Sequence, residues 1–130
     1  MAVERINPQG LHDPVDNLYA HVVRASGTIY RIGGQVPVDV DGRNLHAGDM
    51  AAQIRSCYEQ VTVALESVGL GWGYVVHIYT FTTDMDAYIA AEPPIAKSFF
   101  GEEPPASTLV EVSRLVEKEW LVEVQVDAVA

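Results

Sequence analysis

Cysteine and long apolar runs are nearly absent from this sequence. Cys57 is the only cysteine among 130 residues, so no disulfide can form within the chain. No uninterrupted apolar run reaches the length of about 18 residues that a membrane-spanning helix needs. The N-terminal residues 1–8 include Glu4, Arg5 and Pro8 and lack the apolar stretch of a signal peptide. We therefore expect a protein of the reducing cytoplasm with no membrane partner.

Positive charge is also scarce. The chain has 8 Lys and Arg against 18 Asp and Glu, for a formal net charge of −10, and its basic residues occur singly. Nucleic-acid binding depends on clustered cations that neutralise phosphates. The charge pattern thus predicts that nucleic acid is not a partner.

Metal ligands do not recur at a useful spacing either. His12, His46 and His77 are not spaced as metal ligands relative to one another or to acidic residues. We expect no metal site and assign these histidines structural or exposed positions.

What is present suits one folded domain. Hydrophobic residues make up 48% of the chain, enough for a buried core, and neither a repeat nor a linker divides residues 1–130. We predict a single domain over 1–130.

The first helix is the most clearly marked element. Asp49 can accept hydrogen bonds from the first turn, and Gly69 suits the residue that follows a helix end. Apolar residues recur between them at three- and four-residue spacing, and Cys57 lies on that apolar face. The pattern favours Cys57 as a small buried hydrophobe rather than a nucleophile.

A second helix follows Asp86, but Pro93 and Pro94 lie within it. Two adjacent prolines remove backbone donors and clash with the preceding turn. We predict a break, with a short segment to Ala91 and a restart through Phe100.

Strands account for most of the remainder. The first 18 residues, rich in Pro, Asn, Asp and Gly, are predicted to be irregular. The next two strands are expected to form a hairpin about Ser26-Gly27, and the third, apolar on both faces, suits a central position. The predicted strands are Tyr19–Ala25, Thr28–Gln35, Val75–Thr82, a strand beginning at Ala106, and Trp120–Val129.

This order of elements indicates an α+β fold with both helices on one face of a mixed sheet. On the last strand Val122, Val124 and Val126 alternate with polar residues. We interpret their side as an apolar face that a small monomer cannot cover alone, which favours an oligomer.

The stretch 99–115 joins the end of a helix, two prolines and the start of a strand, so it places Ser107 and Thr108 at the mouth of a sheet. Within it, Pro105-Ala106-Ser107-Thr108-Leu109-Val110-Glu111-Val112 resembles the signature of the Rid (RidA, YjgF or L-PSP) family. That signature usually reads Pro-Ala-Arg-Ser/Thr, two residues, then Glu-Val. Ser107 stands where most deaminating members have the arginine.

Further short segments resemble the family in the same order along the chain, and the resemblance extends from Tyr19 to the end. They are Val23–Ala25, Gly34–Pro37, Ala51–Gln53 with Arg55, Thr82–Met85 and Val122–Val124.

The resemblance implies a chorismate-mutase-like fold that assembles as a homotrimer. Its sheets form a central barrel, its helices lie outside, and its pockets lie in the clefts between subunits. Well-known members hydrolyse reactive enamines and imines made by pyridoxal-phosphate enzymes, releasing a 2-oxo acid and ammonia, and they use no cofactor.

Only some of the family's pocket residues are present at the matching positions of this sequence. Tyr19 matches the pocket tyrosine, and Glu123 matches the glutamate that positions water. Gly34 matches a pocket glycine, while Gly33 replaces the serine before it. The asparagine of the second helix falls near Glu92 or Pro93 and is lost.

The change at Ser107 bears most directly on function. An amino-acid-derived substrate needs a cation for its carboxylate, and serine offers one neutral hydroxyl. Loss of that contact forfeits about 2–3 kcal/mol of binding. We expect Ser107 and Thr108 to contact a substrate that lacks a dominant carboxylate anchor.

Two further residues could reach the site. His21 shares a strand face with Tyr19 and could supply acid–base chemistry, although an ordinary hydrogen-bonded histidine is the simpler interpretation. Arg31 shares a face with Gly33 and could replace the missing cation, although a surface arginine is the common outcome.

The leading hypothesis is thus a homotrimer that adds water to a C=N or enamine group of a small molecule, with Glu123 guiding the water. One alternative is a non-catalytic trimer that binds a ligand or a protein. Another is a tautomerase or hydrolase of a specialised pathway.

Overall fold

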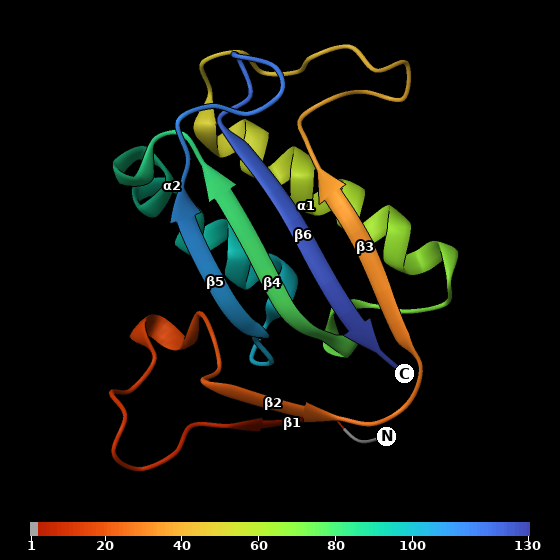
Figure 1. The fold of residues 1–130 in the computed structure, drawn as a ribbon, viewed down its shortest axis with the longest axis vertical. Helices are drawn as coiled ribbons and strands as arrows, with labels where there is room; N and C mark the ends of the chain where they lie inside the picture. Colours follow the sequence, from red (N-terminus) through yellow and green to blue (C-terminus); the bar gives the residue numbers. More distant parts are fainter. Residues whose placement is uncertain (1–2) are drawn as a thin grey trace.

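A four-stranded mixed sheet forms the centre of the computed structural model, which describes residues 3–130 (Figure 1). Its strand order is β3-β6-β4-β5, with β4 and β5 parallel and the other neighbours antiparallel. A separate two-stranded sheet pairs β1 with β2. The strands are β1 (Val3–Ile6), β2 (Val22–Ala25), β3 (Ile29–Gln35), β4 (Val75–Thr82), β5 (Ala106–Glu111) and β6 (Val122–Val129).

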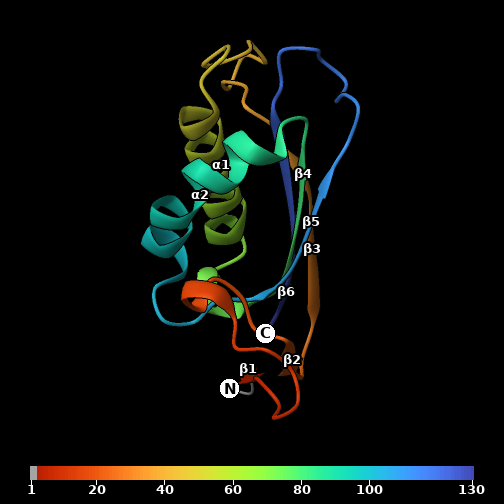
Figure 2. The same ribbon diagram turned by 90° about the vertical axis from the view of Figure 1, so that its left-hand side faces the viewer.

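Two helices, α1 (Met50–Ser67) and α2 (Met85–Phe100), cover one face of this sheet, and the other face is bare (Figure 2). Short 3-10 turns occupy Val15–Asn17 and Trp72–Tyr74. The predicted α+β fold with both helices on one face is confirmed, and β4 lies inside the sheet as expected. No helix among residues 3–130 is long and apolar enough to cross a membrane.

Helix α1 begins and ends where its sequence indicates. The Asp49 carboxylate accepts from the Ala52 backbone N–H at 3.1 Å, and Gly69 follows the helix with a φ of 78°, a conformation that glycine adopts without strain. Cys57 is fully buried under the sheet, as predicted. Burial, reinforced by the charge of Glu123, raises the pKa of its thiol to about 12, so Cys57 stays an inert thiol at neutral pH.

The predicted break in the second helix is wrong. Helix α2 runs through Pro93 and Pro94 without interruption. The carbonyls that lose their donors belong to Ile89 and Ala90, which are exposed, so water can replace the missing bonds. Burial of Tyr88, Ile95, Ala96 and Phe100 against the core holds the helix together across the prolines.

The predicted hairpin is also wrong, and the N-terminal arm that was expected to be irregular contains strand β1. Strand β2 pairs with β1, at residues expected to be irregular, and β3 joins the other sheet beside β6. The chain turns away at Gly27, where a side chain would collide with the backbone of Ala130. Thr28 and Ala130 then exchange backbone hydrogen bonds of 2.7 and 3.0 Å, which align β3 with β6.

The apolar face of β6 is covered within a single chain. Val122, Val124 and Val126 are fully buried beneath the helices, so the reason given above for an oligomer is wrong. The bare face instead carries Ile29 and Val110, which are 60% and 39% exposed, beside the half-buried rings of Tyr79 and Phe81.

Candidate functional site

A cavity of about 210 Å³ opens between β5, the helices and the N-terminal segment. We call it the Ser107 cavity. Its lining combines apolar and aromatic side chains with a few polar groups: Leu18, Tyr19, Tyr58, Ile78, Glu92, Phe100, Ser107 and Leu109. Such a lining is typical of small-molecule sites.

Strand β5 places the two hydroxyl residues of the signature, Ser107 and Thr108, on opposite faces of the sheet. Ser107 and Leu109 point toward the helices and line the cavity. Thr108 points to the bare face, where its hydroxyl is hydrogen bonded to His77 Nε2 at 3.0 Å, and the His77 ring stacks on Tyr79. Burial lowers the pKa of His77, while the nearby Asp127 raises it to a smaller extent. Within one chain, only Ser107 of this pair can contact a ligand in the cavity.

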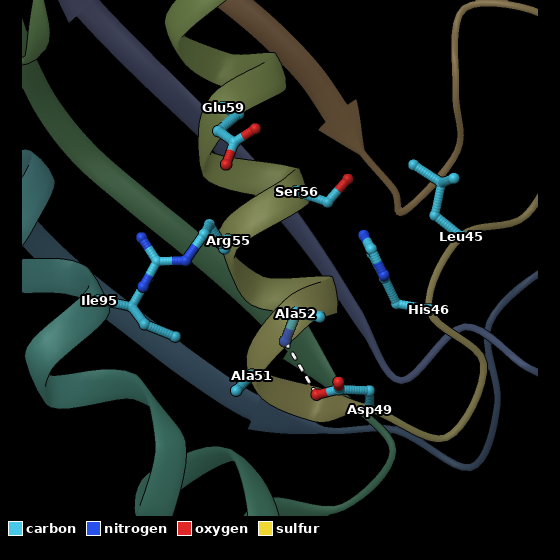
Figure 3. Close-up of a pocket in the computed structure, with 9 residues that line it drawn as sticks. All are labelled: Leu45, His46, Asp49, Ala51, Ala52, Arg55, Ser56, Glu59 and Ile95. Carbon is cyan, nitrogen blue, oxygen red and sulfur yellow. Dashed lines mark hydrogen bonds between the residues drawn. The ribbon is translucent and has the colours of Figure 1, made fainter.

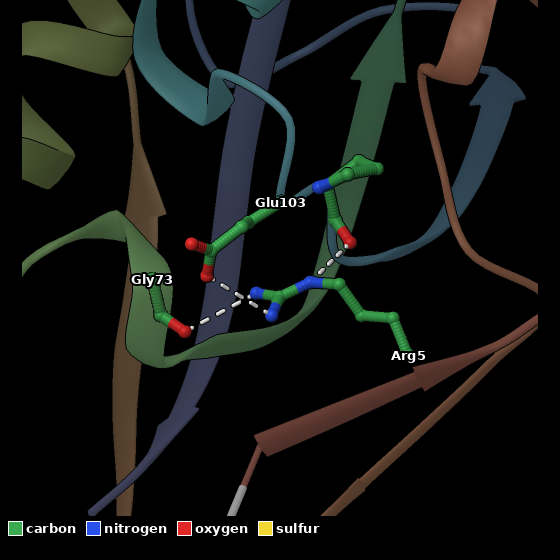
Figure 4. Close-up of polar contacts among 4 residues, drawn as sticks. Arg5, Gly73 and Glu103 are labelled. Atoms are coloured by element: carbon green, nitrogen blue, oxygen red, sulfur yellow. Dashed lines mark hydrogen bonds and ion pairs between the residues drawn. The ribbon is translucent and has the colours of Figure 1, made fainter.

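The N-terminal segment is fastened to the loop that precedes β5 (Figure 4). The Arg5 guanidinium donates to the Pro104 carbonyl at 2.9 Å and the Gly73 carbonyl at 3.1 Å, and it pairs with Glu103 at 3.4 Å. Nearby, the Ala20 backbone N–H donates to the Pro105 carbonyl at 3.0 Å. These contacts hold the segment against β5 and so bring Tyr19 to the cavity.

Tyr19 is held by two histidines. Its hydroxyl is hydrogen bonded to His12 Nε2 at 2.7 Å. His21 Nε2 donates to the His12 carbonyl at 2.7 Å, and the two imidazole rings meet edge to face. The His21 ring lies 5.7 Å from that of Tyr19, but neither residue belongs to a strand, because β2 begins only at Val22. His21 orients His12 and does not line the cavity.

Glu92 supplies the carboxyl group of the cavity. It projects from α2, and its Oε2 accepts a hydrogen bond of 2.5 Å from the Tyr88 hydroxyl. Burial raises the pKa of Glu92, and the Tyr88 hydrogen bond opposes that shift only in part. Burial raises the pKa of Tyr88 and of Tyr58 as well, so both phenols stay neutral.

Glu123 lies on the other side of the sheet, where β6 passes a bulge in β3. The register of β3 shifts between Ile32 and Gln35, at Gly33 and Gly34. A Cβ built on Gly34 would overlap the Glu123 carboxylate and come within 2.8 Å of its Cδ, whereas one on Gly33 would meet nothing within 4 Å. Gly34 thus makes room for Glu123, but the structure does not bring Glu123 into the Ser107 cavity of the same chain.

Arg31 projects on the bare face and pairs with Asp127 at 3.6 Å. It does not line the Ser107 cavity. Arg31 pairs with Oδ2 of Asp127. The other oxygen, Oδ1, is buried without a hydrogen-bond partner among the described residues.

A larger hollow, about 410 Å³, lies where α1 begins (Figure 3). Arg55 and Glu59 border it, but the Asp49 carboxylate already accepts from the first turn of the helix. That capping leaves the helix N-terminus unsuited to an anion. Over residues 3–130, no three His, Cys, Asp or Glu side chains gather as metal ligands would.

Sequence reasoning missed His12 and the buried Tyr88–Glu92 pair. Tyr88 and Glu92 are four residues apart on α2, and Ile95 and Ala96 continue the same buried face. That spacing could have placed the Glu92 carboxyl among apolar side chains. The expected break at the prolines concealed it.

Comparisons with known proteins find relatives in sequence and in fold. A family model described as Endoribonuclease L-PSP matches residues 12–130. The 3-aminoacrylate deaminase RutC of Acinetobacter baylyi is 32% identical over 124 residues, which are 95% of each chain. A RutC family protein of Pyrococcus horikoshii is 31% identical over 107 residues, 82% of each chain.

A solved structure from Yersinia pestis, YyfB, is described as a protein of unknown function of the conserved Rid protein family. It superposes with a TM-score of 0.89 at 25% identity and full coverage of both chains. A member of the YjgF/YER057c/UK114 family from Mycobacterium tuberculosis shares the fold with a TM-score of 0.68 at 23% identity, covering 99% of this chain and 100% of that one. The chain therefore belongs to the Rid/YjgF/L-PSP family.

Proposed function

We propose that this protein is a homotrimeric hydrolase that adds water to the C=N bond of an imine, or of an enamine through its imine tautomer. Its substrate is not a simple amino-acid-derived 2-imino acid. The observation that carries this proposal is the composition of the Ser107 cavity within one chain, where none of the described Arg, Lys or His side chains lines the wall. A carboxylate entering it would find hydroxyl groups and the acidic Glu92.

The chemistry is supported by the relative from Acinetobacter baylyi, whose name is 3-aminoacrylate deaminase. In such a reaction water adds to the carbon of the C=N bond, and that bond breaks as nitrogen takes protons and leaves as ammonia. The oxygen atom of the water stays on the carbon and becomes the oxygen of a carbonyl group. Glu123 is our candidate for the group that orients the water and accepts its proton.

Assembly into a trimer brings Glu123 of one subunit to the Ser107 cavity of another. Glu123 and the Ser107 cavity lie on opposite faces of one sheet, so they can meet only across a contact between subunits. Strands β3 and β5 are the two edges of that sheet. In a closed ring the β5 edge of one copy faces the β3 edge of the next, which carries the bulge beside Glu123.

The bare face of the sheet supports the same assembly. The strand registers put Ile29, Tyr79, Phe81 and Val110 on that face. No element within residues 3–130 covers it (Figure 2). A surface of this kind is typical of a subunit interface. We expect light scattering at micromolar concentration to give three times the chain mass of 14.2 kDa.

The activity is tested by ammonia release from a panel of imines, with and without an anionic group. Wild type should hydrolyse at least one carboxylate-free imine above the spontaneous rate, and Glu123→Gln should reduce that rate by about 100-fold or more. Glu66→Gln, on the exposed face of α1, is the matched control. Ligand binding without turnover of any imine would favour the non-catalytic alternative.

A further inference from the structure

Glu92 is an acidic group with no cation beside it. It forms none of the ion pairs found among residues 3–130, and no basic side chain contributes to its pKa. A carboxylate that is largely removed from water and has no counter-charge is costly to the folded protein. A cationic group that bound next to Glu92 would therefore stabilise its carboxylate.

One oxygen of this carboxyl group is free to receive it. Oε2 is occupied by the Tyr88 hydroxyl, whereas Oε1 has no hydrogen-bond partner in the described part of the chain. Oε1 is accessible to solvent, and Glu92 lines the cavity. A donor that enters the cavity can reach it.

The walls around Glu92 suit an organic cation. The rings of Tyr19, Tyr58 and Phe100 line the same cavity, and those of Tyr58 and Phe100 lie 5.7 Å apart between centroids. Aromatic faces attract cations through the negative potential of the ring, and they also bury apolar groups. Ser107 adds a hydroxyl that can accept from an N–H group.

We propose that the Ser107 cavity selects its ligand by a cationic nitrogen, an ammonium or a protonated imine, which pairs with Glu92 while a small apolar body lies against the aromatic rings. This inference rests on the proposed function and names the substrate class for the same site. The cavity volume of about 210 Å³ limits the apolar body to a single ring or a short branched chain.

The test compares three probes of one shape: benzylammonium, benzyl alcohol and benzoate. Each is titrated into the full-length protein, and binding is followed through the backbone amide resonances of Ser107 and Leu109. Benzylammonium should bind about tenfold or more tightly than benzyl alcohol, as expected for a hydrogen bond to a charged group. Benzoate should bind most weakly.

Two variants then identify the partner of the cation. Glu92→Gln keeps the shape and the Tyr88 contact, and it should abolish the preference for benzylammonium over benzyl alcohol. Asp86→Asn removes one charge from the exposed start of the same helix and should preserve that preference.

Equal affinities for benzylammonium and benzyl alcohol in wild type would overturn the proposal, as would a preference that survives Glu92→Gln. Both outcomes are independent of catalysis. A Glu92-dependent preference in a protein that hydrolyses no imine would support this inference while contradicting the proposed activity.

Discussion

Replacing Ser107 with arginine should restore recognition of a carboxylate only when the charge of Glu92 is removed in the same protein. Position 107 and Glu92 line one cavity of about 210 Å³. A guanidinium introduced by Ser107→Arg alone would pair with the free oxygen of Glu92, because both side chains line the same cavity. The substrate carboxylate would have to displace it.

The size of the effect follows from the contact that is gained. A charge-assisted hydrogen bond contributes about 2–3 kcal/mol, which corresponds to about 30- to 150-fold in binding. We expect Ser107→Arg alone to raise kcat/KM for the imine of alanine by less than about fivefold, because the Glu92 carboxylate competes with the substrate carboxylate for the introduced arginine. The double variant Ser107→Arg with Glu92→Gln should raise it by about 30-fold or more. The difference between the single and the double variant corresponds to about 1 kcal/mol or more, and it becomes a coupling energy once the effect of Glu92→Gln alone is subtracted.

The assay measures ammonia release above the spontaneous rate from the imine that an amino-acid oxidase produces in place. Ser107→Arg with Asp86→Asn is the matched control, because it carries the same net charge but leaves Glu92 intact. Adding Glu123→Gln to the active double variant should abolish the gain.

Equal activity of the single and double variants would show that the introduced arginine does not meet Glu92. Wild-type turnover of the alanine imine as fast as that of an arginine-bearing relative would refute the argument that Ser107 changes the substrate class.

Three further outcomes are expected. Because burial raises the pKa of Glu92 above its usual 4.5, the folded state holds this proton more tightly than the unfolded chain, and the unfolding free energy should fall as pH rises above 4.5. Urea midpoints of Glu92→Gln should match wild type below pH 4.5 and exceed it increasingly above; a difference that is constant with pH would contradict this. RNA binding should be undetectable at physiological salt, given the net charge of −10, and a sub-micromolar, salt-dependent affinity in a filter-binding assay would overturn the charge argument. Arg5→Met should lose about 1–3 kcal/mol of stability and speed amide exchange at Ala20, because two hydrogen bonds to the loop before β5 and one to Gly73 disappear; unchanged exchange would show that Arg5 does not hold the segment.

Local signals in the sequence predicted much of this fold. Helix α1 and strand β4 follow from an N-cap, an apolar periodicity and an apolar run, all of which act within a few residues. The partner of β2 could not be found in this way. Strand β3 leaves β2 to pair with β6, where Thr28 bonds to Ala130, a residue far away in the sequence.

The site residues likewise differ in whether local sequence features could reveal them. The signature around Ser107 located the cavity, because helix end, prolines and strand start are local features. Glu92 was not assigned to the cavity, since it is brought there by a helix that continues through two prolines. The contact of His12 with Tyr19 was not predicted either, since it depends on the packing of the N-terminal segment.

The bulge at Gly33 and Gly34 also affects the behaviour of the sheet edges in a crowded solution. An exposed strand edge can template pairing with any other chain and so promote aggregation. Edge strand β3 is interrupted by the bulge and carries Arg31, two features that discourage open-ended pairing. Edge strand β5 has neither, and only its first residue, Ala106, is bridged, by Ala20. In a subunit separated from its neighbours, β5 would therefore be the edge from which aggregates grow.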